Sequence, residues 1–110
     1  IRLSGGQQAR IALARTLLHK SKLIILDDPF SAVDMQTEEI IITNLRKNYQ
    51  NCLLIIISHR LAIFSQIDRI VLLHSDRSAE YGTHRQLMEN SELYATIYNL
   101  QQLAGDRDEE

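Results

Sequence analysis

Residues 23–34 read LIILDDPFSAVD, and this stretch decides the fold of the chain. It opens with four aliphatic residues without alternation, a pattern typical of a short strand buried on both faces of a sheet. Pro29 cannot continue the strand because it has no N–H group to donate. Asp27 and Asp28 are therefore predicted at the carboxyl end of a buried parallel strand, where open α/β sheets place their ligand sites.

Two adjacent carboxylates at such an edge favour a cationic partner, because a desolvated carboxylate is costly without one. A phosphate-bound Mg²⁺ would supply that charge. Since successive strand residues point to opposite sides, we expect Asp27 and Asp28 to act differently, one on the metal and the other on a reacting water. The alternative interpretation is a strand end followed by an ordinary polar turn.

Composition limits the class of protein. The chain has 110 residues, a formal net charge of −2, 45% hydrophobic residues and one cysteine, a length that suits one small domain or a piece of a larger one. The near-neutral charge argues against a dedicated nucleic-acid surface. Cys52 cannot form an internal disulfide, which fits a reducing compartment. No apolar stretch approaches the roughly 20 residues of a membrane helix, and the first residues, without an initiator Met, indicate a fragment.

A second apolar run, residues 52–57, leads directly to His59. A helix predicted over residues 35–48 separates the two runs, so they form a parallel βαβ unit. Asp34 is a suitable N-cap for that helix. By the same geometry as before, His59 is expected at the carboxyl edge of the sheet, on the side of Asp27. From the residues alone, a structural role and a ligand role for this histidine stay equally open.

The N-terminal segment, residues 3–7, reads LSGGQ and precedes a predicted helix. Apolar residues recur along that helix, namely Ala9, Leu13 and Leu17, with Ala14 and Leu18 beside them. Ser4 is a suitable N-cap, and the two glycines expose backbone amides at the positive end of the helix. These features together favour an anion such as phosphate, and the alternative is an ordinary Ser-capped helix.

The second half of the chain predicts two further strands within residues 68–81, the second returning as an edge strand. Thr83 and Gln86 have the spacing of a capping box that starts a short helix. Residues 91–102 have the apolar periodicity of a last amphipathic helix. An acidic, flexible tail is expected over residues 104–110.

Three motifs in this order resemble the nucleotide-binding domain of ABC transporters. LSGGQ matches the ABC signature motif letter for letter, the strand ending at Asp27 and Asp28 is similar to a Walker B strand, and SAVD at residues 31–34 looks like the D-loop. The resemblance covers residues 1–103. It implies an α/β fold, a partial P-loop NTPase (RecA-like) domain with a mostly parallel sheet and flanking helices. The tyrosines and leucines of the last predicted helix resemble the exporter branch.

The resemblance also implies how the residues would work on ATP and Mg²⁺, held between two such domains. Asp27 would bind the metal, Asp28 would serve as the general base, and His59, as the switch histidine, would hydrogen-bond the γ-phosphate. The remaining implied contacts are those of the signature motif with the partner domain's nucleotide and of the D-loop along the interface: Ser4, Gly5, Gly6, Gln7, Ser31 and Asp34.

The implied function is ATP hydrolysis that powers export across a membrane. The implied partners are a second nucleotide-binding domain, identical or different, and the transmembrane domain of the same transporter, with no nucleic acid. The implied location is the cytoplasmic face of the cell membrane. A less favoured alternative is an ABC ATPase of DNA repair, which would usually carry coiled-coil or zinc insertions and a basic surface. The transported substrate does not follow from the sequence.

The chain departs from the family pattern in three places. The G-x-x-x-x-G-K-[ST] phosphate loop and the Q-loop are absent, so the Walker A half is missing and we expect this chain alone to bind ATP poorly and to hydrolyse none. Asp28 stands where efficient members have Glu, which leaves open a homodimer with a working Asp28 and a heterodimer in which this site is degenerate and mainly regulatory. The turn at residues 75–79 lacks the usual glycine, from which we expect only a slightly different hairpin.

Overall fold

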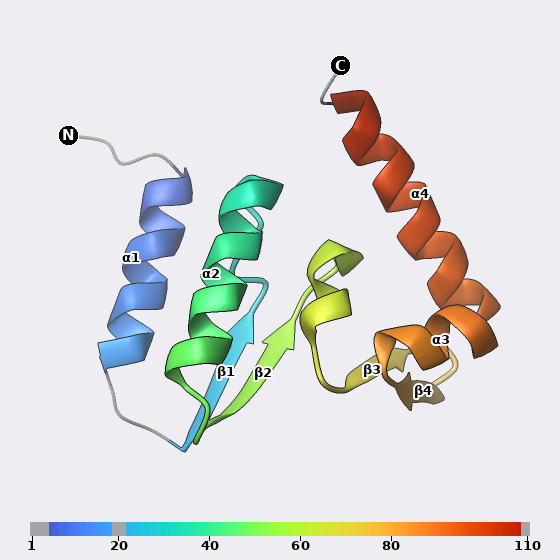
Figure 1. The fold of residues 1–110 in the computed structure, drawn as a ribbon, viewed down its shortest axis with the longest axis horizontal. Coiled ribbons are helices and arrows are strands. Elements are labelled where there is room, and N and C mark those ends of the chain that lie inside the picture. Colours follow the sequence, from blue (N-terminus) through green and yellow to red (C-terminus); the bar gives the residue numbers. More distant parts are fainter. Residues whose placement is uncertain (1–4, 19–21, 109–110) are drawn as a thin grey trace. The chain divides into compact units, whose positions relative to one another are not determined.

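The computed structural model of the chain describes residues 5–18 and 22–108 (Figure 1). The chain divides into two compact units between His59 and Arg60. The elements, in chain order, are the helix α1 (Gly5–Leu18), strand β1 (Leu23–Asp27), helix α2 (Met35–Asn48), strand β2 (Leu53–Ile57), the 3₁₀ helix η1 (Leu61–Gln66), strands β3 (Ile70–Leu73) and β4 (Ala79–Gly82), and helices α3 (His84–Asn90) and α4 (Glu92–Asp108).

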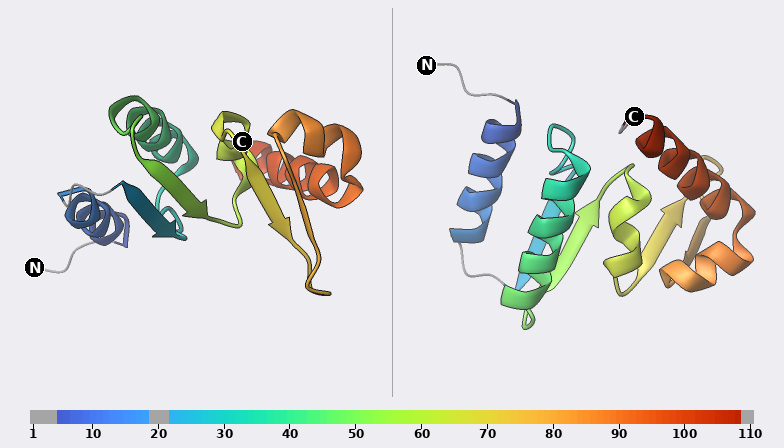
Figure 2. Two further views of the ribbon diagram at one scale, coloured as in Figure 1. Left: turned by 90° about the horizontal axis from the view of Figure 1, so that it is seen from below. Right: turned by 45° about the horizontal axis from the view of Figure 1, so that its top comes forward.

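The N-terminal unit is built on the predicted parallel βαβ arrangement, which the structure confirms. β1 and β2 pair in parallel, in a register that runs from Leu23 opposite Leu53 to Asp27 opposite Ile57. α2 connects the two strands and lies across one face of the pair (Figures 1 and 2). The α/β class expected from the sequence is therefore correct.

Burial in this small sheet differs from the prediction. Ile24 and Leu26 of β1 are buried, but Leu23 and Ile25 are 49% and 55% exposed. The strand was predicted to be buried on both faces, and within the described residues it is buried on one. The reason is that the described helices screen one face of the sheet from water and leave the aliphatic residues of the other face open. The core of the unit is completed by side chains from the following loop and from α2: Phe30, Val33, Ile42 and Leu45.

The predicted cap of α2 is present, whereas the burial of α1 differs from the prediction. Asp34 caps α2, its carboxylate accepting a hydrogen bond from the backbone N–H of Thr37 at 3.2 Å. α1 has Leu13 and Leu17 half-buried, whereas Ala14 is exposed and Leu18 is 80% exposed. The apolar stripe of α1 is thus narrower than the sequence indicated. The predicted N-cap of α1, Ser4, lies outside the described residues.

The C-terminal unit is an antiparallel strand pair, β3 with β4, packed with η1, α3 and α4. Its core contains Leu61, Ile70, Leu87 and Tyr94, with partly buried apolar residues packed around them. The predicted capping box is present, because Thr83 Oγ1 accepts from the N–H of Gln86 at 3.1 Å and Gln86 Oε1 accepts from the N–H of Thr83 at 2.9 Å. The edge strand and the start of α3 are therefore confirmed.

The hairpin between β3 and β4 lacks the expected glycine, and one of its other residues adopts a strained backbone conformation. Arg77 adopts a left-handed backbone conformation with φ 74°, and the N–H of His74 donates to the carbonyl of Ser78 at 2.9 Å to close the turn. Asp76 accepts a hydrogen bond from the N–H of Ser78 at 2.9 Å. The turn keeps its hydrogen bonds, but Arg77 occupies a region that favours glycine.

The last helix is longer than predicted. α4 extends to Asp108, whereas the apolar periodicity indicated an end at Gln102. The following residues contain no proline and only one glycine, so nothing in them stops a helix. Most of the predicted tail, residues 104–110, therefore continues α4.

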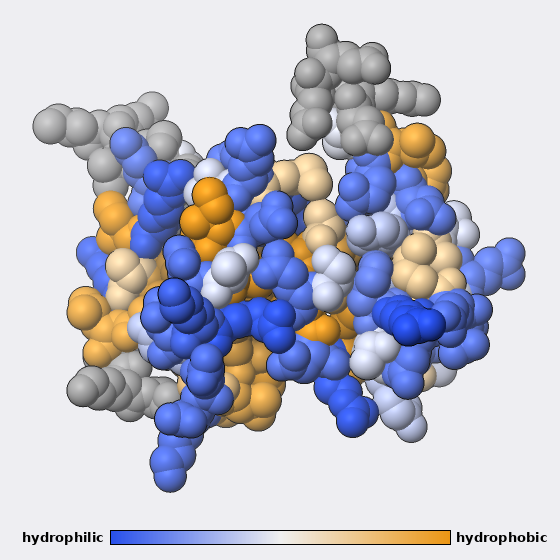
Figure 3. Space-filling view, viewed as in Figure 1, coloured by the Kyte–Doolittle hydropathy of each residue, from blue (hydrophilic) through white to orange (hydrophobic). Residues whose placement is uncertain are grey.

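The surface carries both hydrophilic and hydrophobic side chains. Hydrophilic side chains predominate on the face seen in Figure 3, and hydrophobic residues form separate patches among them. None of the helices within residues 5–18 and 22–108 combines the length and apolar character needed to cross a membrane.

Candidate functional site

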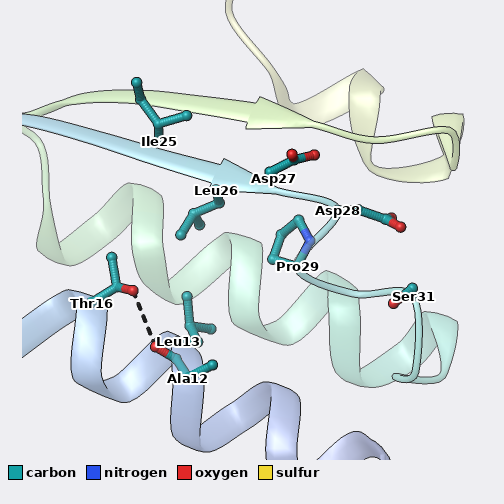
Figure 4. Close-up of a pocket in the computed structure, with 9 residues that line it drawn as sticks. All are labelled: Ala12, Leu13, Thr16, Ile25, Leu26, Asp27, Asp28, Pro29 and Ser31. Carbon is teal, nitrogen blue, oxygen red and sulfur yellow. Dashed lines mark hydrogen bonds between the residues drawn. The ribbon is translucent and has the colours of Figure 1, made fainter.

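The two carboxylates singled out in the sequence lie at the end of β1. Asp27 is the last residue of the strand, and Asp28 follows it in a left-handed conformation with φ 47°. Asp adopts this region more readily than most residues. Both side chains are exposed, and both extend beyond the end of the strand (Figure 4). Because Asp28 already lies outside β1, the alternation predicted for successive strand residues does not apply to it.

A backbone hydrogen bond ties this turn to the neighbouring strand. The N–H of Asp28 donates to the carbonyl of Ile57 at 2.7 Å, one step beyond the last residue pair of the β1–β2 ladder. His59 follows Ile57 by two residues and is exposed. The carboxylates and the histidine therefore leave the same edge of the sheet, as the parallel arrangement predicted.

A pocket of about 260 Å³ lies beside this edge, between α1 and the end of β1 (Figure 4). Thr16 Oγ1 donates to the carbonyl of Ala12 at 3.1 Å, so this hydroxyl is used within α1. The pocket wall is mainly apolar, and its polar groups are concentrated at the loop end. The lining residues are Ala12, Leu13, Thr16, Ile25, Leu26, Asp27, Asp28, Pro29 and Ser31.

The start of α1 lies against the segment that follows the carboxylates. A Cβ atom added to Gly5 would stand 3.2 Å from the Cβ of Ala32, closer than side-chain carbons normally approach, so this contact favours glycine at position 5. Gln7 in the first turn is exposed. Gly6 is also in this turn, and Ser4 lies outside the described residues. The described part of the LSGGQ segment is thus brought next to the SAVD loop.

The residues of the SAVD loop differ in exposure and in their hydrogen bonds. Ser31 is exposed, whereas Val33 is buried and its N–H donates to the carbonyl of Phe30 at 3.1 Å. The pKa of Asp34 is lowered from its ordinary value of 3.8, first by the hydroxyl of Thr37 and then by the N–H of the same residue, with a smaller contribution from the charge of Arg10 in α1. Asp34 is therefore ionised at neutral pH and committed to capping α2.

The described side chains supply few ligands for a metal ion at the end of β1. No group of three or more His, Cys, Asp or Glu side chains within the described ranges is arranged to hold a metal ion. Asp27 and Asp28 nevertheless supply the hard carboxylate oxygens that Mg²⁺ prefers, and Mg²⁺ usually takes only one or two carboxylates, with waters and phosphate oxygens completing its shell. The donor set therefore fits a magnesium ion that arrives with a phosphate ligand.

A polar network in the C-terminal unit was not anticipated from the sequence. Glu80 Oε2 accepts hydrogen bonds from Ser91 Oγ at 2.6 Å and from His74 Nε2 at 3.0 Å. The pKa of Glu80 is lowered, mainly by the hydroxyl of Ser91. Ser91 Oγ in turn accepts from the N–H of Tyr94 at 3.2 Å. Because the partners come from β4, the hairpin before it, the link between α3 and α4, and α4 itself, no local pattern in the sequence indicated this network.

His84 is the first residue of α3. Its Nδ1 lies 2.7 Å from the hydroxyl of Tyr94, and its ring packs edge-on against Tyr98, with centroids 4.8 Å apart. Burial lowers the pKa of His84 and raises the pKa of Tyr94 to about 12. This ring cluster holds α3 against α4.

Comparison with known proteins gives consistent results. The sequence profile of the ABC transporter family matches residues 1–31. The ATP-dependent lipid A-core flippase of Chromobacterium violaceum is 45% identical over 100 residues, which are 91% of this chain and 17% of that protein. The leukotoxin translocation ATP-binding protein LktB of Mannheimia haemolytica is 42% identical over 100 residues, or 90% of this chain and 14% of that protein.

A solved structure supports the same assignment. The structure of a bacterial Atm1-family ABC exporter with ATP bound matches with a TM-score of 0.83 and 36% identity, over 90% of this chain and 18% of that one. The chain therefore spans less than a fifth of the length of these relatives. From its sequence motifs, its fold and these matches, the chain belongs to the family of ABC transporter ATP-binding domains.

Proposed function

We propose that this chain is part of the ATP-hydrolysing domain that drives export by an ABC transporter. The observation that supports the proposal most directly is the sheet edge at which β1 ends on Asp27 and Asp28 and at which His59 follows β2. The backbone bond from Asp28 to Ile57, 2.7 Å long, fixes the spacing of these two exits. An edge of this kind suits phosphoryl transfer, which depends mainly on positioning and electrostatics.

Each polar residue of the edge has a chemical task in this proposal. Asp27 ligates the magnesium ion that accompanies ATP, and that ion offsets the negative charge of the phosphate oxygens. Asp28 accepts a proton from the attacking water, for which its carboxylate must come within hydrogen-bond reach, about 2.6–3.2 Å, of that water. His59 donates a hydrogen bond to an oxygen of the γ-phosphate, which imidazole can do in its neutral or charged form.

The signature segment serves a second domain. Ser4, Gly5, Gly6 and Gln7 would approach the γ-phosphate bound by a partner ATP-binding domain, where backbone amides at a helix start favour an anion. Ser31 would face that interface. Asp34 would contribute indirectly, because its carboxylate caps α2 and thereby fixes the end of the SAVD loop. The close approach of Gly5 to Ala32 supports this arrangement, since it places the start of the signature helix beside the loop.

The partners follow from the same proposal. A second ATP-binding domain completes each nucleotide site, and a transmembrane domain converts the closure of the pair into transport at the cytoplasmic face of the cell membrane. Since the chain carries no G-x-x-x-x-G-K-[ST] phosphate loop, the 110-residue chain alone is expected to bind ATP weakly and to turn over none.

The decisive experiment measures steady-state ATP hydrolysis by the full-length protein that carries this chain, assembled as its transporter, with and without Asp28→Asn. Asn keeps the size of the side chain and tolerates the left-handed backbone at this position, so only the base is removed. We expect a loss of at least about 100-fold in kcat, the lower range for general-base catalysis. A matched control is Glu89→Gln, which also removes one carboxylate but at an exposed position on α3.

The outcomes separate the two versions of the function. A collapse of turnover assigns the base to Asp28 and favours a homodimer. Unchanged turnover means that this site is degenerate and mainly regulatory, and that a partner domain hydrolyses ATP against residues 4–7 of this chain. An assembled wild-type transporter that hydrolyses no ATP would contradict the proposed function.

A further inference from the structure

A histidine and a tyrosine meet where the last two helices pack against each other. The Nδ1 atom of His84, at the start of α3, lies 2.7 Å from the hydroxyl oxygen of Tyr94 on α4. The His84 ring also stands edge-on to the rings of Tyr94 and Tyr98, with centroids 5.6 and 4.8 Å apart. All three residues belong to the C-terminal unit, so the contact lies within one compact body.

The surroundings of Tyr94 decide which of the two groups donates. Tyr94 is 0% exposed, so water does not reach its hydroxyl. Burial raises the pKa of Tyr94 to about 12, so the phenol keeps its proton at neutral and acid pH. Within residues 5–18 and 22–108, the hydroxyl has no hydrogen-bond partner other than His84 Nδ1. Because a buried hydroxyl proton needs an acceptor, Tyr94 donates to Nδ1, and His84 is neutral with its own proton on Nε2.

Protonation of His84 disrupts this arrangement. In the charged imidazole both ring nitrogens carry a proton, so Nδ1 becomes a donor. The Tyr94 oxygen can accept from it, but the Tyr94 O–H then faces no acceptor among the described residues. A buried donor without an acceptor loses its hydration without compensation. The contact between the two helices is therefore favourable with neutral His84 and unfavourable with charged His84.

The titratable groups on the elements around His84 do not offset this effect. Arg85 and Glu89, on α3 itself, pair with each other at 3.4 Å and are 89% and 62% exposed, so water screens their charges. Tyr98 faces the imidazole with its ring. The 3₁₀ helix η1 carries no titratable side chain. The remaining titratable side chains that are described on β4 and α4, apart from Tyr94, are Glu80 and the exposed Tyr81 and Glu92.

A second histidine of the unit responds to acid in the opposite sense. His74 Nε2 lies 3.0 Å from Glu80 Oε2. The pKa of Glu80 is lowered, first by the hydroxyl of Ser91, so this carboxylate stays ionised in weak acid. A protonated His74 is attracted to it. Acid therefore strengthens the contact between His74 and Glu80, and a loss of packing on acidification would come from His84.

We propose that His84 and Tyr94 form a pH-dependent clasp between α3 and α4, which neutral His84 closes and protonated His84 opens. Burial lowers the pKa of His84 below its ordinary value of 6.5. The clasp therefore stabilises the C-terminal unit fully above that pH, and its contribution declines as the pH falls towards the lowered pKa. Neither residue has a task in the proposed ATP hydrolysis, so the clasp is independent of it.

The test is hydrogen-exchange mass spectrometry of the full-length protein that carries this chain. Exchange is compared at about pH 7.5 and about pH 5, on either side of the ordinary histidine pKa, with the intrinsic effect of pH on exchange corrected for. In the wild type, peptides of α3 and of the start of α4 should exchange at least about fivefold faster at the lower pH, the factor expected from one unsatisfied buried hydroxyl.

Four variants identify the groups responsible. His84→Asn offers Tyr94 an amide oxygen as acceptor but does not titrate, so it should abolish the pH step. Tyr94→Phe removes the hydroxyl, so it should speed exchange already at the higher pH and reduce the step. The matched control Tyr98→Phe removes a hydroxyl from the same helix, keeps the ring beside His84 and should retain the step. His74→Asn removes the other histidine of the unit and should also retain it.

Four results would overturn the clasp. They are a wild type without the pH step, a full step in His84→Asn, wild-type exchange of Tyr94→Phe at both pH values, and an equal effect of Tyr98→Phe and Tyr94→Phe. The second would assign the titration to another group, and the third would show that ring contacts alone hold the helices. Because the readout does not include ATP turnover, a failure of the proposed function would leave this result unaffected.

Discussion

Replacing Arg77 by glycine should stabilise the C-terminal unit. Arg77 adopts a left-handed conformation at φ 74° in the β3–β4 turn, and its side chain is exposed. For a residue with a Cβ atom this conformation costs roughly 1–2 kcal/mol, which Arg77→Gly removes. Against this gain, glycine has more freedom in the unfolded chain, at a cost of roughly 0.5–1 kcal/mol. The expected net increase in the free energy of unfolding is therefore about 0.5–1 kcal/mol.

The assay is thermal and urea unfolding of the chain, followed by circular dichroism. For a unit of this size, 1 kcal/mol corresponds to about 4–8 °C in Tm, so a rise of about 2–8 °C is expected. The matched control is Arg77→Ala, which removes the long side chain but keeps the Cβ atom and therefore the strain. Arg77→Ala should not raise Tm.

Two observations would refute this reasoning. If Arg77→Gly left Tm unchanged or lowered it, the left-handed conformation would not be a source of strain. If Arg77→Ala stabilised the chain as much as Arg77→Gly, the arginine side chain rather than the backbone would be responsible.

Two further predictions concern helix starts. Thr83→Ala removes half of the capping box with Gln86 and should lower the free energy of unfolding by about 1 kcal/mol. Thr83→Ser keeps the hydroxyl and should retain the stability of the wild type. Equal Tm values for the Ala and Ser variants in thermal unfolding would contradict the role of the cap. Thr37 lowers the pKa of Asp34 in the folded state below its unfolded value near 3.8. The ionised carboxylate therefore stabilises the fold above that pH, and this contribution is lost as the pH falls through the folded pKa. In an acid titration followed by circular dichroism, Asp34→Asn, which caps without titrating, should therefore show a weaker loss of helix below pH 3.8 than the wild type; parallel titration curves would contradict this.

Much of the architecture could be predicted because it is encoded locally. The strand end at Asp27 follows from the proline two residues later, and the starts of α2 and α3 follow from the caps at Asp34 and Thr83. The parallel pairing of β1 with β2 follows from two apolar runs joined by a helix. The strand end and the caps depend on neighbours within a few residues, and the pairing follows from the order of the elements, which is why the sequence predicts all of them.

What escaped prediction depends on partners that are distant in the sequence or on backbone conformation. The network around Glu80 of β4 joins His74, in the β3–β4 hairpin, and Ser91, between α3 and α4, and the cap of η1 comes from Gln101. Burial of β1 on both faces was predicted from hydropathy alone, but Leu23 and Ile25 are exposed because burial depends on which elements cover the sheet. The end of α4 was placed too early because apolar periodicity stops at about Gln102 while the helix itself continues.

The hydrogen bond from the N–H of Asp28 to the carbonyl of Ile57 fixes the backbone at this edge of the sheet without using the side chain at position 28. It joins two main-chain groups, so any residue other than proline that adopts the left-handed conformation at position 28 can make it. A single substitution can therefore exchange one acid for another, or for an amide, while the spacing between the two strand exits is preserved. Under the proposed function, a lineage carrying this fold can therefore gain or lose catalytic power at one of two paired sites in one mutational step without rebuilding the domain.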